Sequence, residues 1–305
     1  MCFARSASTR RGVVPKFSDL EVVALSLTAE ALSIDSECLL FSKLNSDYKA
    51  DFPNLISRRQ YNDRRKYLFG LTEKIRKCMS EDTSYFVQST SIDEFEDTYC
   101  IDSKPFEVCR LSRSKRSQVG KTDFEKAPSI GYCASQERYY FGYLYCVRST
   151  RYKLHVLCGI RGVVHSFDLT KAEVADIHYL QDIKTQISDC NILGDKGYLS
   201  AEVQLDLFQT ASIRLETPMR INQKNYKPQF YLFRRFRKRV ETLLLRLSSA
   251  QVSQLDDQFM LTRNYAKDTS GIFTRILAKI TAATALQYIN KINNRPIGKL
   301  KYAVC

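Results

Sequence analysis

Three carboxylates occupy positions where a carboxylate needs a compensating charge. Asp102 lies inside an apolar, strand-like run at residues 98–105, and Asp195 ends a second apolar run. Glu241 lies in the middle of a helix-like segment rich in arginine, lysine and leucine. An acid at the end of a buried strand is costly unless something cationic compensates it. If the three acids converge in the fold, they would form a divalent-metal site suited to phosphoryl transfer.

These residue types fit that chemistry. Phosphodiester cleavage needs a nucleophile made reactive beside one metal ion and a second ion that neutralises the leaving oxygen, with the ions about 4 Å apart. Mg²⁺ prefers oxygen ligands and keeps several waters, so two aspartates and one glutamate are sufficient, and Mn²⁺ is an alternative. We expect Asp102 to bridge both ions, Asp195 to bind one and Glu241 the other. For Glu241 alone, an exposed ion pair with Arg237 is also a reasonable interpretation.

The charge of the chain favours a partner that carries phosphates. Forty-seven Lys and Arg residues against thirty-three Asp and Glu give a net charge of +14. Cations cluster in residues 110–121 and 214–239, and both segments adjoin candidate metal ligands. A charge run is usually a solvated face, but two runs beside the same acids favour a phosphate track. The candidate DNA-binding residues are Arg58, Arg59, Arg64, Arg65, Lys104, Arg113, Lys115, Arg116, Lys153, Lys196, Arg234, Arg237 and Lys238.

The first part of the chain has a helical pattern. Between residues 17 and 88 apolar residues recur at spacings of three and four, which predicts three or four short helices. Ser18 and Glu21 form a capping-box pattern at the first of them. Residues 57–66 (SRRQYNDRRK) open a helix whose arginines we expect to be exposed. The segment is typical of a recognition helix in a helix-turn-helix unit, although a solvated helix face explains it equally well.

The remainder alternates between strand and helix patterns. Strands are predicted at residues 98–105, 139–147, 152–159, 162–168, 190–193 and 212–216, with a hairpin turn at 159–162. Helices are predicted at residues 173–187, 200–210, 233–247 and 269–290. This order predicts an α/β (α+β) fold of the ribonuclease-H-like type, in which helices flank a mixed sheet. The expected divisions are a basic disordered arm (1–16), a helical DNA-binding region (17–88), a catalytic domain (89–295) and a loose tail (296–305).

Cysteine usage and hydropathy indicate the compartment. Ten cysteines without a CxxC pair argue against zinc and against a disulfide scaffold. Reduced thiols point to the cytoplasm. Residues 1–16 lack the apolar segment of a signal peptide, and the charge-free stretch at 280–290 is far below the ~20 residues that span a bilayer. We therefore expect a soluble, cytoplasmic protein with no membrane partner.

An ordered set of motifs resembles the DDE transposases of bacterial insertion sequences. The motifs are IDSKP (101–105), GKTDFEKAP (120–128), YKLH (152–155), GDKGY (194–198) and RKRVET (237–242), so the likeness covers nearly the whole chain. It implies an enzyme that binds terminal inverted repeats, cleaves DNA at the element ends and joins the freed 3′ hydroxyls to target DNA. It also implies that Asp102, Asp195 and Glu241 are the catalytic, metal-binding triad. Two ends brought together imply at least a dimer.

The chain departs from that family at two positions near Glu241, and the segments near 142–152 and 248–254 look like duplicated or added sequence. Members often carry Tyr seven residues before the Glu and Lys seven residues after it, where this chain has Arg234 and Ser248. Two other functions therefore stay open. One is a catalytically degenerate DNA-binding protein that recognises the repeats without cutting, and the other is a structure-specific nuclease that does not join strands.

Overall fold

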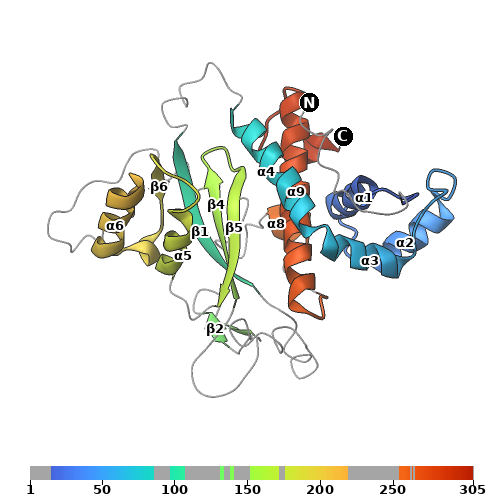
Figure 1. Ribbon diagram of the computed structural model, residues 1–305, viewed down its shortest axis with the longest axis horizontal. Helices are drawn as coiled ribbons and strands as arrows, with labels where there is room; N and C mark the ends of the chain where they lie inside the picture. Colours follow the sequence, from blue (N-terminus) through green and yellow to red (C-terminus); the bar gives the residue numbers. More distant parts are fainter. Residues whose placement is uncertain are drawn as a thin grey trace.

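The computed structural model describes residues 15–85, 97–106, 131–133, 138–140, 152–171, 176–218, 254–261, 263 and 265–304 (Figure 1). The chain begins with four helices, α1 (Asp19–Ala31), α2 (Glu37–Ser46), α3 (Arg58–Tyr67) and α4 (Phe69–Tyr85). The predicted capping box is present at α1, where the Ser18 hydroxyl accepts the Glu21 N–H at 3.2 Å. Ser57 and Gln60 form a second capping box at α3, so both helices begin where the pattern predicted.

A five-stranded mixed sheet follows. It contains β1 (Thr98–Phe106), β4 (Tyr152–Gly159), β5 (Val164–Lys171), β6 (Asn191–Leu193) and β7 (Arg214–Glu216), in the order β5-β4-β1-β6-β7. The pairs β5–β4 and β4–β1 are antiparallel, whereas β1–β6 and β6–β7 are parallel. Three antiparallel strands followed by two parallel ones confirm the predicted mixed sheet of a ribonuclease-H-like fold. The predicted hairpin turn is also present, with Gly162 at φ +80° donating its N–H to the Gly159 carbonyl at 2.8 Å.

Shorter elements complete the described chain. They are the ribbon β2 (Gly131–Cys133) with β3 (Arg138–Tyr140), the 3₁₀ turns η4 (Asp176–His178), η5 (Lys196–Tyr198) and η6 (Leu300–Ala303), and the helices α5 (Tyr179–Ile183), α6 (Ala201–Ala211), α8 (Gln254–Asp257) and α9 (Thr269–Ile292). The single helix predicted for 173–187 is wrong from residue 176 onward, where η4 and one short helix take its place. The buried side chains of Tyr179, Leu180 and Ile183 anchor that short helix against the sheet before the chain turns toward β6.

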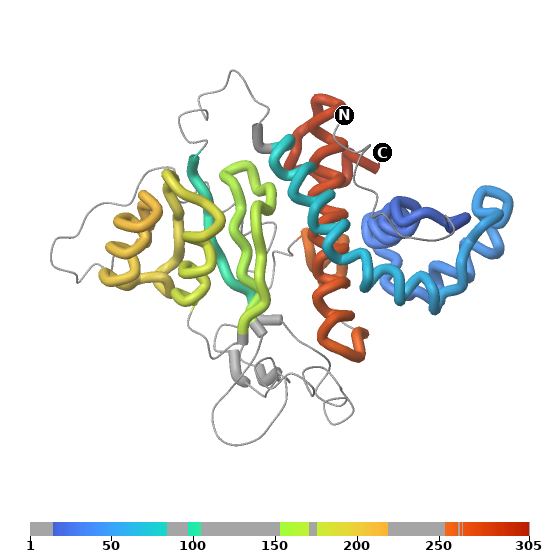
Figure 2. The backbone as a smooth tube through the Cα atoms, viewed as in Figure 1, coloured from blue at the N-terminus to red at the C-terminus, as the bar shows by residue number. Residues whose placement is uncertain are grey.

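The elements form layers around α9 (Figures 1 and 2). One face of the sheet packs through Leu154, Val156 and Leu193 against apolar residues of α9, including Ile276 and Ile280. The other face packs against α5 and α6, and the first helices have an apolar cluster of their own. Because α1 and α4 pack along the opposite side of α9, this helix is buried nearly all round, which explains its long apolar sequence.

The C-terminal residues are part of this packing. Leu300 is only 1% exposed and belongs to the apolar cluster between α9 and the sheet. The Asn290 side chain donates a hydrogen bond to the Lys299 carbonyl at 2.9 Å. Residues 296–304 therefore do not form the loose tail that we expected.

Candidate active site

The sheet aligns the first two predicted acids. In the parallel pair β1–β6, Thr98 lies opposite Asn191 and Cys100 opposite Leu193. Asp102 and Asp195 each follow the last of these pairs by two residues, Asp102 still within β1 and Asp195 just beyond the end of β6, as the cap of η5. Side chains at matching positions of paired strands point to the same face of the sheet. This register is the geometric basis of the candidate site.

Backbone N–H groups orient both carboxylates. Asp102 is 6% exposed, and its Oδ1 accepts the N–H of Ser103 at 2.8 Å. Asp195 is half-buried and caps η5, where its Oδ1 accepts the N–H of Gly197 at 2.7 Å. Hydrogen bonds to ionised carboxylates are stronger than neutral ones, so both groups are held in place before any ligand arrives.

A third carboxylate, which the sequence analysis missed, lies beside Asp195. A Cβ placed on Gly197 would lie 2.9 Å from Asp195 Oδ1 and 3.3 Å from Asp176 Oδ2, so the two acids flank one glycine. The other oxygen of Asp176, Oδ1, accepts a hydrogen bond from Lys153 Nζ at 2.9 Å. In the sequence, Asp176 lies in a helical pattern that also carries Glu173 and Asp182. No spacing rule connects it to the other two.

Tyr198 is a buried side chain whose pKa is affected by the charges of all three acids. Its side chain is fully buried, and its hydroxyl has no hydrogen-bond partner among the described residues. Burial raises the pKa of the Tyr198 hydroxyl well above its usual value, and the negative charges of Asp176, Asp102 and Asp195 raise it further. The phenol is therefore held in its neutral form.

His155 lies on β4 and has a packing role. Its ring stacks on Tyr179 with centroids 4.9 Å apart, and its Nε2 is 2.7 Å from the hydroxyl of Thr170. Burial lowers the pKa of His155 to about 4, an effect that Asp176 opposes and Lys153 reinforces. The imidazole is thus neutral at pH 7.

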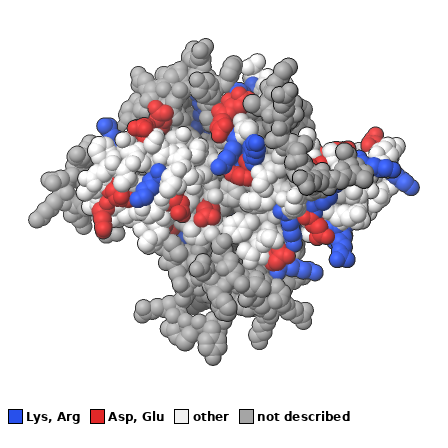
Figure 3. All heavy atoms as spheres, viewed as in Figure 1, with Lys and Arg blue, Asp and Glu red and all other residues white. Residues whose placement is uncertain are grey.

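The candidate DNA-binding residues fall into different environments. Arg58 and Arg59 are exposed on α3, and Lys and Arg side chains project at the end of the molecule formed by α2 and α3 (Figure 3). Lys196 is exposed next to Asp195. Lys104, in contrast, is buried and forms an ion pair with Asp256. The predicted residues Arg113, Lys115, Arg116, Arg234, Arg237, Lys238 and Glu241 lie outside the described residues.

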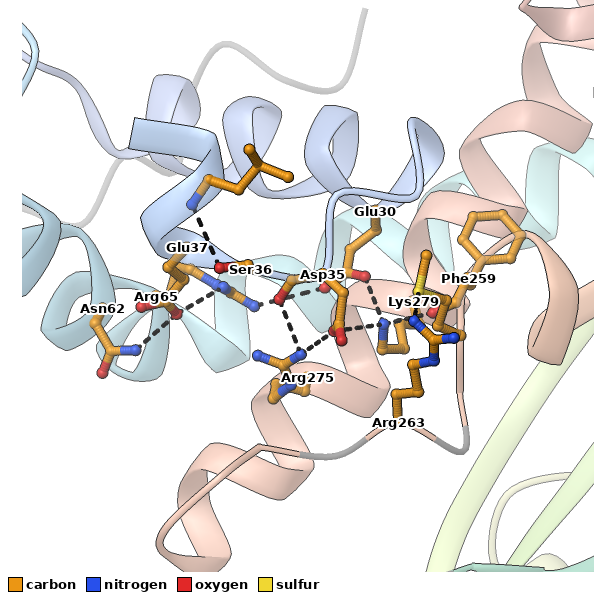
Figure 4. Close-up of polar contacts among 12 residues, drawn as sticks. Glu30, Asp35, Ser36, Glu37, Asn62, Arg65, Phe259, Arg263, Arg275 and Lys279 are labelled. Atoms are coloured by element: carbon orange, nitrogen blue, oxygen red, sulfur yellow. Dashed lines mark hydrogen bonds and ion pairs between the residues drawn. The ribbon is translucent and has the colours of Figure 1, made fainter. Parts of the chain in front are cut away.

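Two arginines of α3 face the protein. Arg64 donates to Asp19 at 2.6 Å and to the Phe17 carbonyl at 2.7 Å. Arg65 is 8% exposed and pairs with Glu37 at 3.2 Å (Figure 4). The expected exposure of Arg65 is wrong because the acids of α1 and α2 lie on the inner side of α3, and sequence spacing along α3 cannot reveal them.

The donor set suits a hard divalent cation. Asp102 and Asp195 offer carboxylate oxygens, which Mg²⁺ prefers, and their fixed orientation favours a defined geometry. Within the described parts of the chain, no three His, Cys, Asp or Glu side chains are arranged to hold a metal ion. The predicted third ligand, Glu241, is outside those parts.

None of the described helices is long and apolar enough to span a membrane.

The mixed sheet carries Asp102 within its central strand β1 and Asp195 just beyond the end of the neighbouring strand β6. Residues 92–256 match a family described as a transposase DDE domain. Because this match spans more than half of the chain, the protein belongs to that family of DDE transposases. The match includes both Asp102 and Asp195.

Comparison with solved structures gives weaker similarities. A pre-cleavage Mos1 transpososome shares 13% identity at a TM-score of 0.23, covering 92% of this chain and 81% of the other. A Mos1 transposase paired-end complex with the left transposon end gives the same identity and TM-score over 94% and 82%. A Mos1 mariner paired-end complex with Mn gives a TM-score of 0.22 at 13% identity over 95% and 82%. The search of curated proteins found no match.

Proposed function

We propose that this transposase cleaves DNA at the ends of an insertion sequence and joins those ends to target DNA, using Mg²⁺ or Mn²⁺ held by Asp102, Asp195 and Glu241. The observation that supports the proposal is the β1–β6 register, because Asp102 and Asp195 each lie two residues beyond its last pair, Cys100 with Leu193. Both belong to the segment that matches the transposase DDE family. Glu241 is included in the proposed metal site because of its position in the RKRVET motif.

In this proposal, each protein group has a limited task. When bound, divalent ions activate the attacking oxygen and neutralise the leaving oxygen of the phosphodiester. The chain contributes Asp102 and Asp195, whose carboxylates the N–H groups of Ser103 and Gly197 keep in orientation. His155 takes no proton in this scheme, since it is neutral and enclosed by Tyr179 and Thr170.

DNA contacts are assigned to cations that reach the surface. We infer that Arg58 and Arg59 on α3 contact the terminal repeats, while Lys153 and Lys196 contact the strand that enters the acidic site. Arg65 and Lys104 are left out because their charges are engaged inside the protein. The remaining predicted contacts, from Arg113 to Lys238, stay proposals from the sequence. Two ends must meet for transposition, so we propose that the active form on DNA is a homo-oligomer.

The test is end cleavage with matched variants. The full chain is incubated with DNA that carries the sequence flanking its gene, over a titration of Mg²⁺ or Mn²⁺. We expect cleavage at the element ends, and a loss of at least about 100-fold in Asp102→Asn, Asp195→Asn and Glu241→Gln, because each removes a proposed ligand. Gel-shift affinity for the same DNA should be retained in all three.

Two results would redirect the proposal. Wild-type protein that binds the ends but never cuts, at any metal concentration, would indicate a degenerate DNA-binding protein. Ends that are cut but never join a supplied target would indicate a nuclease without strand transfer. An Asp102→Asn variant that cleaves at the wild-type rate would contradict the assigned site itself.

A further inference from the structure

The last part of the chain, residues 269–305, carries cations but no acids. Its sequence contains six Lys and Arg residues and neither Asp nor Glu. Three of these cations pair with acids of the first helices and their loops, as Arg275–Asp35, Lys279–Glu30 and Lys291–Asp82. Those three charges therefore belong to the packing of α9. The other three, Arg295, Lys299 and Lys301, lie beyond the end of α9.

These three cations gather around Tyr302. Lys299 and Lys301 are exposed, and neither forms an ion pair with an acid of the described residues. Both ammonium groups lie over the Tyr302 ring, 5.4 Å and 5.6 Å from its centroid. Arg295 is also exposed, and its guanidinium donates to the Tyr302 carbonyl. Like charges held together on a surface favour an anionic partner.

The backbone that presents the two lysines is fixed. Leu300, which lies between them, is 1% exposed and belongs to the apolar cluster of α9 and the sheet. The Asn290 side chain donates to the Lys299 carbonyl at 2.9 Å, and the Gln254 side chain donates to the Gly298 carbonyl at 2.8 Å. Charges that only keep a protein soluble need no such support. A binding surface gains affinity when its groups are held in place before the partner arrives.

Helix stabilisation does not account for these lysines. A cation stabilises the C-terminus of a helix within the last turn, and Lys291 already occupies that turn of α9. Lys299 and Lys301 come after the helix end at Ile292. Lys301 lies in the last turn of η6, but a four-residue 3₁₀ turn aligns few peptide dipoles.

This surface is separate from the exposed arginines of α3. The ion pair of Lys66 with Asp268 places the end of α3 at the start of α9, whereas the C-terminal cations lie at the other end of α9 (Figure 1). α9 has 24 residues and is therefore about 36 Å long. A DNA contact at α3 thus does not explain the C-terminal cations.

We propose that Arg295, Lys299 and Lys301 form a second DNA contact, which binds the phosphate backbone of a duplex without reading its sequence. The inference rests on the proposed function, because that function makes DNA the anionic partner, but it does not depend on the metal site. Lysine contacts to phosphates add affinity and fix position, and they carry no sequence information. Each contact also releases condensed counterions, so it contributes to the salt dependence of binding.

The experiment measures DNA binding by the full chain in EDTA, where metal-dependent cleavage does not interfere. Fluorescence anisotropy gives the dissociation constants for the sequence flanking the gene and for a shuffled duplex of equal length, between about 50 and 200 mM KCl. In the variant Lys299→Gln with Lys301→Gln, the slope of log affinity against log salt should become shallower by about 2. Binding to both duplexes should weaken by the same factor. Arg295 is left unchanged because it also donates to the Tyr302 carbonyl.

Two control variants separate a local contact from net charge. Lys184→Gln with Arg214→Gln makes the same change in net charge at the end of α5 and on the edge strand β7, and should leave the slope unchanged. Lys299→Arg with Lys301→Arg keeps both charges and should keep the wild-type slope.

The outcomes separate this inference from the proposed function. If the wild-type chain binds DNA and the Lys299 and Lys301 glutamine variant has the same slope, the proposal fails while the proposed function stands. An equal change of slope in the Lys184 and Arg214 variant would also overturn it, because net charge would explain the effect. So would a loss of affinity confined to the flanking sequence, which would indicate sequence readout. If the wild-type chain binds neither duplex, the proposed function is itself contradicted.

Discussion

The buried ion pair between Lys279 and Glu30 should hold the first helices against α9, and its removal gives a sharp stability test. Lys279 Nζ lies 2.7 Å from Glu30 Oε2 and 3.8 Å from Asp35 Oδ1, and it also donates to the Phe259 carbonyl (Figure 4). The Lys279 and Glu30 side chains are 2% and 6% exposed. Both charges are therefore almost fully removed from water.

Lys279→Met keeps the apolar stem but leaves Glu30 buried without its main cation. Arg65 then remains 3.9 Å from Glu30, too far for a normal hydrogen bond. Breaking a buried pair from one side typically costs 3–5 kcal/mol, so we expect a loss of about 3 kcal/mol in unfolding free energy. For a chain of this size that corresponds to a drop of about 6 °C in melting temperature.

Urea denaturation followed by circular dichroism measures the change, with two further variants as controls. Lys184→Met breaks a solvent-accessible pair with Asp206 and should cost far less stability than Lys279→Met. The double variant Lys279→Met with Glu30→Leu removes both buried charges and should recover at least half of the loss. Equal, small effects of Lys279→Met and Lys184→Met would refute the reasoning, as would a double variant less stable than Lys279→Met alone.

Two further predictions concern the candidate site. Burial depresses the pKa of His155 to about 4, so the unfolded chain binds the proton more tightly; the stability due to neutral His155 is present above about pH 6.5 and is lost as pH falls toward 4. Urea titrations at pH 7 and pH 4 measure this difference in unfolding free energy. Replacing His155 with Gln should reduce the difference between the two pH values by up to about 3 kcal/mol. An unchanged difference would contradict the assignment. Gly197→Ala places a Cβ 2.9 Å from Asp195 Oδ1, so the carboxylate must shift, and end cleavage should fall at least about tenfold with little change in melting temperature. Gly298→Ala, which meets no atom within 4 Å, is its control, and equal cleavage by both variants would show that the position of Asp195 is not critical.

Much of the fold followed from local patterns. The alternation at residues 152–159 corresponds to β4, the capping boxes mark the starts of α1 and α3, and the periodicity of residues 269–290 corresponds to α9. These features depend on residues within one or two turns of each other, so the sequence determines them directly. The placement of Asp102 on a central strand followed from its apolar neighbours in the same way.

The tertiary structure decided which side chains meet. The sequence could not bring Asp176 to Gly197 or turn Arg65 toward Glu37, because neither contact repeats at a helical or strand period. The Lys279–Glu30 pair joins residues 249 positions apart. Local propensity determines the elements of this protein, whereas their packing determines the charges around its acidic site, since an ion pair depends on distance in space and not on spacing in the chain.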